Sequence, residues 1–139
     1  MNTWWIYALL ASLFASLTAI LAKVGVKGVD SDLATAIRTV VVLVIAWTLV
    51  WARGATSGLA TLSKSNLLFL VLSGVATGLS WLFYFKALQL GKVSQVAPVD
   101  KASVALTILL SVIFLNEALT LKAAIGATLI IAGTFVLIW

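Results

Sequence analysis

The sequence contains no cysteine and no histidine, and only four of its 139 residues are acidic. Disulfides, thiolate nucleophiles and iron–sulfur clusters all require cysteine, so the sequence excludes them. Zinc sites and Ser-His-Asp triads normally need histidine, and clustered carboxylates are also missing. We therefore expect no enzyme activity, no metal and no cofactor.

Charge is scarce as well. Charged residues make up 9% of the chain and hydrophobic residues 63%, whereas a soluble domain carries about 25% charged residues. So few charges cannot cover a surface that faces water. The net charge of +5 is spread along the chain instead of forming a basic stripe, so it does not indicate nucleic-acid binding. We interpret the basic residues as groups that flank the membrane or lie inside it.

Long uncharged runs account for most of the sequence. Four runs carry no charge and a fifth is interrupted only by Arg38; they are Met1 to Ala22, Ser65 to Phe85, Ala102 to Asn116, Ala123 to Trp139, and Leu33 to Ala52. A helix needs about 20 residues to cross a bilayer, and the third run reaches that length when it is extended back to Val96. We predict an all-α integral membrane protein, a single domain over residues 1–139, with transmembrane helices at about 4–26, 33–52, 67–90, 96–115 and 121–139.

Several residues suit the ends of these helices. Ser31 or Asp32 can cap the second helix, and Thr120 can cap the fifth. Pro98 falls in the first turn of the predicted fourth helix, where its missing N–H costs little. Five of the six tryptophans lie near predicted helix ends, where indoles usually mark the headgroup level; they are Trp4, Trp5, Trp47, Trp51 and Trp139.

The distribution of basic residues leaves the orientation open. Five is an odd number, so the two termini lie on opposite faces of the membrane. The loops on the side of the N-terminus carry Arg53, Lys64 and Lys122, and those on the other side carry Lys27 and Lys92. Counting the slightly deeper groups reverses this balance in favour of the second side; these are Lys23, Arg38, Lys86 and Lys101. The positive-inside signal thus changes sign with the counting rule, which permits insertion in both orientations.

Polar residues inside the spans form three stripes at helical spacing. The stripes are Asp100, Ser103, Thr107 and Ser111; Ser73, Thr77, Ser80, Trp81 and Tyr84; and Ser12, Ser16 and Lys23. Any single hydroxyl is more often bonded to its own helix or to a neighbouring one. Three stripes together indicate a shared polar interior, because polar groups that face lipid are costly.

Basic groups gather at one depth of the predicted bundle. Lys23, Arg38, Lys86 and Lys101 all lie one or two turns from helix ends on the same side, with Asp100 as their one acidic neighbour. Lys86 and Lys101 can extend to the headgroups, but the planar fork of Arg38 suits a carboxylate or phosphate. We interpret this region as a cation-rich vestibule for an anionic or zwitterionic metabolite, with Asp100 paired to Arg38 or Lys86.

Small residues mark two faces that can pack closely. Gly74 and Gly78 form a GxxxG pair on the third helix, and Gly126 and Gly133 share a face of the fifth. The fifth-helix pair suits a contact between subunits. No acidic residue lies near the middle of a span, which argues against a proton-coupled exporter of cations. Glu117 lies in the last connection, where it suits the turn and the start of the fifth helix.

Several of these features, taken in order, resemble the EamA family of the drug/metabolite transporter superfamily. The similar residues are Arg38, Trp81-x2-Tyr84-x2-Ala87-Leu88, Pro98, Leu115-Asn116-Glu117, and Ile125-Gly126-Ala127-Thr128-Leu129-Ile130-Ile131-Ala132-Gly133. Common family members have ten helices in two five-helix repeats, and this chain looks like one repeat. The resemblance implies a central cavity lined by the third and fourth helices of two oppositely inserted copies. The fifth-helix glycines also resemble the last helix of small multidrug resistance proteins, but the acidic residue of their first helix is missing here.

The sequence therefore predicts a secondary transporter, an exporter or exchanger of a small polar or amphipathic metabolite. We expect an antiparallel homodimer in a bacterial or archaeal plasma membrane, working by alternating access and binding no nucleic acid. The predicted substrate-binding residues are Arg38, Trp81, Tyr84, Lys86, Asp100, Ser103 and Thr107, and the predicted dimer interface contains Gly126 and Gly133. The alternatives are an exporter of lipophilic cations similar to small multidrug resistance proteins, and a non-transporting subunit of a hetero-oligomeric membrane complex. An enzyme acting on lipid-linked substrates is a more distant alternative.

Overall fold

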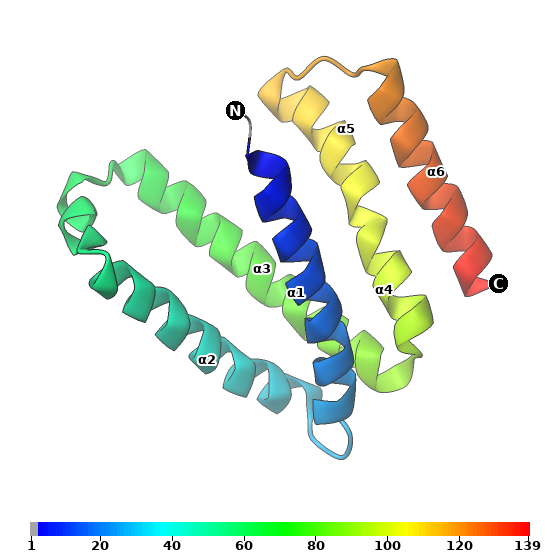
Figure 1. Ribbon diagram of the computed structural model, residues 1–139, viewed down its shortest axis with the longest axis horizontal. Helices are drawn as coiled ribbons and strands as arrows, with labels where there is room; N and C mark the ends of the chain where they lie inside the picture. Colours follow the sequence, from blue (N-terminus) through cyan, green and yellow to red (C-terminus); the bar gives the residue numbers. More distant parts are fainter. Residues whose placement is uncertain (1–2) are drawn as a thin grey trace. The chain divides into compact units, whose positions relative to one another are not determined.

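The computed structural model describes residues 3–139, and every regular element in that range is a helix (Figure 1). Residues 1 and 2 of the predicted domain lie outside the described part. The elements are α1 (Trp4–Gly25), α2 (Ser31–Ala52), the short 3-10 helix η1 (Ala55–Thr61), α3 (Lys64–Leu90), α4 (Val93–Lys101), α5 (Ser103–Leu115) and α6 (Leu121–Ile138).

Five stretches of the described chain are long and apolar enough to cross a membrane. They are α1, α2, α3, the combined α4 and α5 (Val93–Leu115), and α6, with mean hydropathies between 1.8 and 2.2. The prediction of an all-α membrane protein with five spans is therefore confirmed. The second, third and fourth spans begin two or three residues earlier than predicted, at Ser31, Lys64 and Val93.

The helix ends show why α2 begins early. The carboxylate of Asp30 accepts hydrogen bonds from the backbone N–H groups of Asp32 (2.9 Å) and Leu33 (3.1 Å), so Asp30 is the N-cap. The prediction of Ser31 or Asp32 as the cap was wrong by one or two residues, because any of these short polar side chains can reach the free N–H groups. The predicted cap of the last helix is confirmed: Thr120 accepts from the N–H of Ala123 at 3.2 Å.

Pro98 lies inside a helix and not in its first turn, which corrects the prediction. The helix begins at Val93, so Pro98 is its sixth residue, and the chain leaves regular helix at Ala102 before α5 begins. Proline lacks the N–H that would bond to the carbonyl four residues earlier, and its ring crowds that turn. The predicted fourth helix is two helices, α4 and α5, which meet at Ala102, four residues after Pro98.

The chain divides into two compact units. The α2–α3 unit, residues 22–89, contains the last turn of α1, α2, η1 and α3. The α4–α6 unit contains the earlier part of α1, up to Leu21, together with residues 90–139. The predicted single domain over residues 1–139 stays a prediction.

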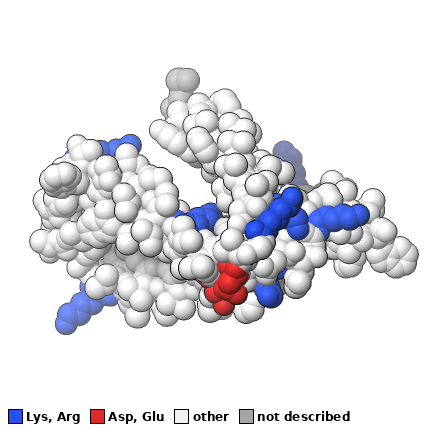
Figure 2. All heavy atoms as spheres, turned by 90° about the horizontal axis from the view of Figure 1, so that it is seen from below, with Lys and Arg blue, Asp and Glu red and all other residues white. Residues whose placement is uncertain are grey.

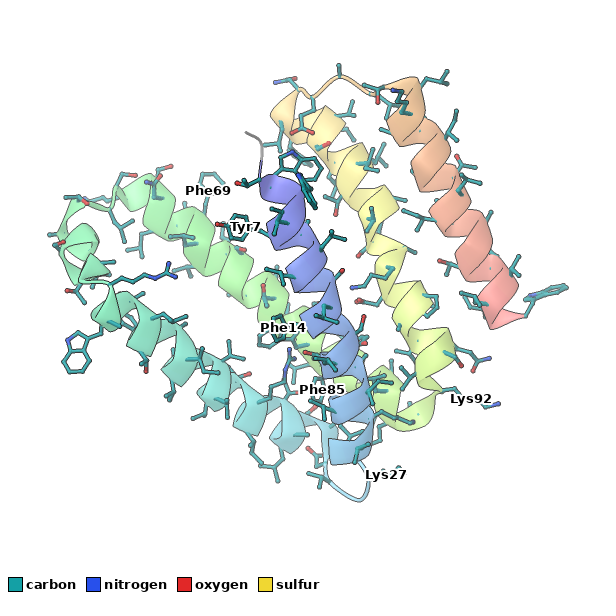
Figure 3. The ribbon with its side chains drawn as sticks, in the orientation of Figure 1. Tyr7, Phe14, Lys27, Phe69, Phe85 and Lys92 are labelled. Carbon is teal, nitrogen blue, oxygen red and sulfur yellow. The ribbon has the colours of Figure 1, made fainter. Side chains whose placement is uncertain are left out.

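The packing of the α2–α3 unit is concentrated at one end. Its buried residues are Val26, Ser31, Thr35, Phe85 and Leu88, which come from the α1–α2 turn, the start of α2 and the end of α3. The other half of α3 is uncovered within the chain: Phe69 is 66% exposed and Phe85 only 3% (Figure 3). The α4–α6 unit has fewer buried residues, and α6 packs mainly against α4 and less against α5.

Candidate functional site

The candidate site of the α2–α3 unit lies where matching faces of two helices meet. Ser31, Thr35 and Arg38 follow one another at intervals of four and three residues, which places them on one face of α2. Trp81, Phe85 and Leu88 have the same spacing on α3. Ser31, Thr35, Phe85 and Leu88 are buried, whereas Arg38 and Trp81 are half-buried. The two rows of facing residues are therefore buried at the packed end of the unit and become half-buried at Arg38 and Trp81.

Arg38 lies over two aromatic rings of α3. Its guanidinium carbon is 4.2 Å from the centre of the Trp81 ring and 5.3 Å from that of Phe85. Both distances are within the range of a cation–π interaction, which is stronger where water is excluded. Trp81 and Tyr84 were predicted to bind the substrate; in this structure Trp81 contacts Arg38, and Tyr84 is half-buried three residues further along α3.

The charge of Arg38 has no carboxylate partner within the α2–α3 unit. The acidic residues of that unit are Asp30 and Asp32, and Asp30 caps α2. The hydroxyls of Thr35 and Thr39 donate to carbonyls of their own helix, at 2.8 Å in both cases. The rings hold the guanidinium in place, but they leave its hydrogen-bond donors available to an anion.

Lys23 has a role that sequence reasoning did not assign. Its ammonium group donates to the carbonyl of Leu88, near the C-terminal end of α3, where free carbonyls and the helix dipole favour a cation. Nearby, the side-chain amide of Gln89 donates to the Val29 carbonyl at 2.9 Å. Both contacts tie the α1–α2 turn to the end of α3. Lys23 therefore helps to hold that end of the unit together, and its place in a cation-rich vestibule stays a prediction.

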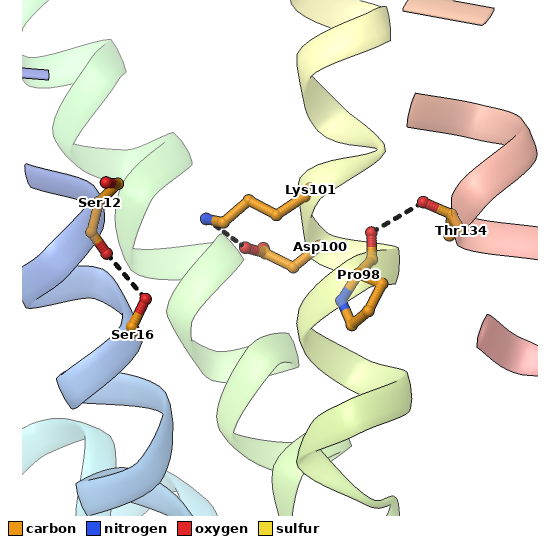
Figure 4. Close-up of polar contacts among 6 residues, drawn as sticks. All are labelled: Ser12, Ser16, Pro98, Asp100, Lys101 and Thr134. Atoms are coloured by element: carbon orange, nitrogen blue, oxygen red, sulfur yellow. Dashed lines mark hydrogen bonds and ion pairs between the residues drawn. The ribbon is translucent and has the colours of Figure 1, made fainter. Parts of the chain in front are cut away.

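Lys86 and Asp100 have partners that lie close to them in sequence. The ammonium of Lys86 lies 3.3 Å from the amide oxygen of Gln89, on its own helix. Asp100 pairs with its neighbour Lys101 at 3.2 Å, in a contact that is 61% exposed on the lysine side (Figure 4). Asp100 belongs to the α4–α6 unit, and Arg38 and Lys86 belong to the α2–α3 unit, so the predicted pairing between them stays a prediction.

The predicted hydroxyl stripes bond to their own helices. Thr107 donates to the Ser103 carbonyl at 2.9 Å, and Ser16 donates to the Ser12 carbonyl at the same distance (Figure 4). Thr77 and Ser111 make bonds of the same kind. Such bonds satisfy a hydroxyl proton in an apolar setting, and they leave the oxygen lone pairs as acceptors. The shared chamber around these stripes stays a prediction.

Thr134 is a residue that sequence reasoning missed. Its hydroxyl lies 3.1 Å from the carbonyl oxygen of Pro98 and joins α6 to α4 (Figure 4). At 8% exposure it is a buried polar residue of the α4–α6 unit. The available signal was a polar threonine directly after Gly133 in an apolar helix. Nothing local indicated that its partner would be a proline carbonyl.

Two small-residue faces are open within the chain. A Cβ atom built at Gly74, Gly78, Gly126 or Gly133 would meet no atom within 4 Å apart from its chain neighbours and the nearby backbone of its own helix. The GxxxG of α3 is thus not used for packing inside the α2–α3 unit. The predicted role of Gly126 and Gly133 in a dimer stays a prediction.

The surface of the described chain fits a protein embedded in lipid. Its tryptophans near helix ends are all between 49% and 106% exposed; they are Trp4, Trp5, Trp47, Trp51 and Trp139.

A hollow of about 310 Å³ lies at the junction of α2 and η1. It is lined by Trp47, Thr48, Trp51 and Thr56, none of which belongs to the predicted site. On the face drawn in Figure 2, blue basic side chains are more widespread than red carboxylates, as expected from nine basic and four acidic residues.

These observations define a class of protein: a multi-pass helical membrane protein with a cationic, aromatic-lined contact inside its spans. The EamA-like transporter family matches residues 2–139. The chain therefore belongs to this family of membrane transporters, which points to a transporter and not to an enzyme.

Two curated proteins extend this result. A protein of a Sinorhizobium species, named "Uncharacterized transporter in cobO 3'region", is 46% identical over 136 residues, which cover 98% of this chain and 96% of that protein. An uncharacterized protein of Methanocaldococcus jannaschii is 39% identical over 71 residues, 51% of this chain and 52% of that protein. No solved structure gives a significant match.

Proposed function

We propose that this membrane transporter carries a small polar or amphipathic metabolite with an anionic group, and that Arg38 binds that group. The observation that carries the proposal is the Arg38 contact. A guanidinium inside a span is held by the Trp81 and Phe85 rings, and no carboxylate neutralises it within its unit. A charge in that setting is costly, so a structural role alone does not account for it, whereas an anionic cargo does.

Other residues contribute to the same proposal. Tyr84 directly precedes Phe85 on α3, and Lys86, five residues after Trp81, adds positive charge on another face of the same helix. Ser103 and Thr107 lie near the middle of a span. The Thr107 hydroxyl donates its proton to the Ser103 carbonyl, so its oxygen can still accept a hydrogen bond from cargo. Asp100, with its local partner Lys101, would set the charge near the entrance.

We further propose that two copies act together as an antiparallel pair and expose the cargo alternately to each side of a plasma membrane. Each half of such a transporter needs an uncovered face, and Gly126 and Gly133 lie on one.

Uptake into proteoliposomes tests the cargo. The probes are radiolabelled benzoate, leucine, glycerol phosphate and tetraphenylphosphonium, presented separately to vesicles with the purified protein and to empty vesicles. Saturable uptake of one or more probes that carry a negative group, lost in Arg38→Ala and partly kept in Arg38→Lys, supports the proposal. Uptake of tetraphenylphosphonium alone, unchanged in Arg38→Ala, would instead identify an exporter of lipophilic cations.

The orientation of the chain tests the pair. The sequence has no cysteine, so a single Trp139→Cys substitution gives one label site at a residue that is 106% exposed. Labelling by a membrane-impermeant maleimide from both sides of sealed cells and inverted vesicles is expected for two opposite orientations. Labelling from one side only would contradict the antiparallel pair.

A further inference from the structure

The junction between α4 and α5 lies one turn after a proline. Pro98 cannot donate to the carbonyl of Ser94, so one bond of the helical ladder is missing within α4. At the junction itself, the N–H of Ala102 is 3.1 Å from both the Pro98 and the Val99 carbonyls. A donor shared in this way bonds weakly to each acceptor. At residues 98 to 102 the backbone thus passes from one helix to the next through a donor with two acceptors.

The Pro98 carbonyl at this junction is contacted by a second helix. The Thr134 hydroxyl of α6 lies 3.1 Å from it and 2.8 Å from the Ile130 carbonyl of its own helix. One hydroxyl has one proton, so it either shares that proton or gives it to one carbonyl at a time. The interhelical bond and the intrahelical bond are thus alternatives for the same donor.

Each partner keeps another bond when the interhelical bond opens. The Thr134 hydroxyl returns to Ile130, and the Pro98 carbonyl keeps the Ala102 N–H. In lipid an unsatisfied polar group costs several kcal/mol, which would normally prevent two packed helices from separating at a polar contact. Here no group is left without a partner, so the polar contact adds no such penalty when α4 shifts against α6.

We propose that Thr134 is a positioning residue that latches the junction after Pro98, passing its proton between the Pro98 and Ile130 carbonyls as α4 moves against α6. The role of this latch rests on the proposed transport function, since alternating access requires a segment that moves between two arrangements. Thr134 itself does not touch cargo. It sets the balance between the two arrangements of α4.

The test measures the distance between α4 and α6 directly. Spin labels at Gln95→Cys on α4 and Lys122→Cys on α6, both exposed positions, report this distance by pulsed electron paramagnetic resonance in the reconstituted full chain. Thr134→Val keeps the shape of the side chain and removes the donor. We expect it to change the ratio of the distance populations about threefold, the average worth of a hydrogen bond between membrane helices.

Two variants serve as controls. Thr134→Ser keeps the hydroxyl and should give the parental distances. Thr128→Val removes a hydroxyl of the same helix that bonds only to its own Ala124 carbonyl, at 2.9 Å, and should also leave the distances unchanged. Equal distance distributions in Thr134→Val and Thr128→Val would overturn the latch, as would a Thr134→Ser protein that behaves like Thr134→Val.

A second substitution keeps the proposal testable if Thr134→Val does not insert. Pro98→Ala restores the missing N–H and should narrow the distribution to one population, whereas an unchanged distribution would refute the latch. The distance measurement needs no cargo. If none of the probes is taken up by any variant, the proposed function fails while the distances still decide the latch.

Discussion

The Arg38 contact and the Thr134 contact show two ways of accommodating a polar group inside membrane-spanning helices. In the α2–α3 unit the guanidinium of Arg38 is held 4.2 Å from the Trp81 ring, and a ring gives it no hydrogen-bond acceptor oxygen. In the α4–α6 unit the hydroxyl of Thr134 reaches two carbonyls, at 2.8 and 3.1 Å. The first group is positioned but not neutralised, and the second is satisfied in either of two ways.

This difference suits the Arg38 contact to binding a ligand and the Thr134 contact to a movement between helices. A positioned but unneutralised cation favours a ligand of opposite charge, whose arrival adds strong charge-assisted hydrogen bonds. A hydroxyl with two equivalent acceptors favours no ligand, and instead allows two helices to change their contact. The predictions below test this division, beginning with the change of largest expected effect.

Leu88→Ala should have the largest effect on stability. Leu88 is fully buried at 0% exposure in the packed end that lies beneath the Arg38 contact. Loss of a buried leucine side chain leaves a cavity and costs about 2 kcal/mol or more. Thermal unfolding in detergent measures the loss, and Leu90→Ala, at a site 78% exposed, is the control. Equal unfolding temperatures for the two variants would contradict a rigid packed end.

Arg38→Ala should reduce uptake of an anionic cargo about 10- to 100-fold, because a hydrogen bond to a charged group is worth about 1.5–3 kcal/mol. The uptake rate of Arg38→Lys should lie between those of the parent protein and Arg38→Ala, since lysine keeps the charge but loses the planar fork. Initial uptake rates in proteoliposomes measure the effect, with membrane yield as the control for insertion. Full uptake by Arg38→Ala would remove Arg38 from the binding site.

Trp81→Ala should weaken cargo binding less than Arg38→Ala does. The ring positions the guanidinium through a cation–π contact worth about 0.5–2 kcal/mol, so the apparent affinity should fall about 2- to 30-fold. Trp81→Phe keeps an aromatic face and should restore most of the affinity. The half-saturating cargo concentration measures this, and a larger loss in Trp81→Ala than in Arg38→Ala would mean that the ring itself contacts cargo.

Lys86→Gln should have the smallest effect, less than about twofold on uptake, since exposed charge contacts contribute little. Its ammonium is exposed and lies 3.3 Å from the Gln89 amide oxygen, away from the face shared by Trp81 and Phe85. Uptake rates under the same conditions as for Arg38→Ala give the comparison. A loss as large as that of Arg38→Ala would extend the anion site to Lys86.

The outcome for the individual residues shows where sequence reasoning holds. The cap at Thr120 could be predicted because a helix cap involves residues only three positions apart. Arg38 could be singled out because a charge within an apolar run is conspicuous by itself. Pro98 was misplaced because the preceding residues, Val93 to Ala97, carry no signal that distinguishes a loop from a first helical turn. The local Asp100–Lys101 pair was overlooked in favour of partners on other helices.

The sequence by itself determined the class and the spans of this protein, because hydropathy and the length needed to cross a bilayer are properties of continuous segments. Only the tertiary structure decided which groups satisfy one another. It placed Arg38 on the rings of Trp81 and Phe85, Lys23 on the end of α3, and Thr134 on the Pro98 carbonyl. Several partners were chemically suitable for each of these groups, and the choice among them depends on which helix faces meet, a property that no single segment encodes.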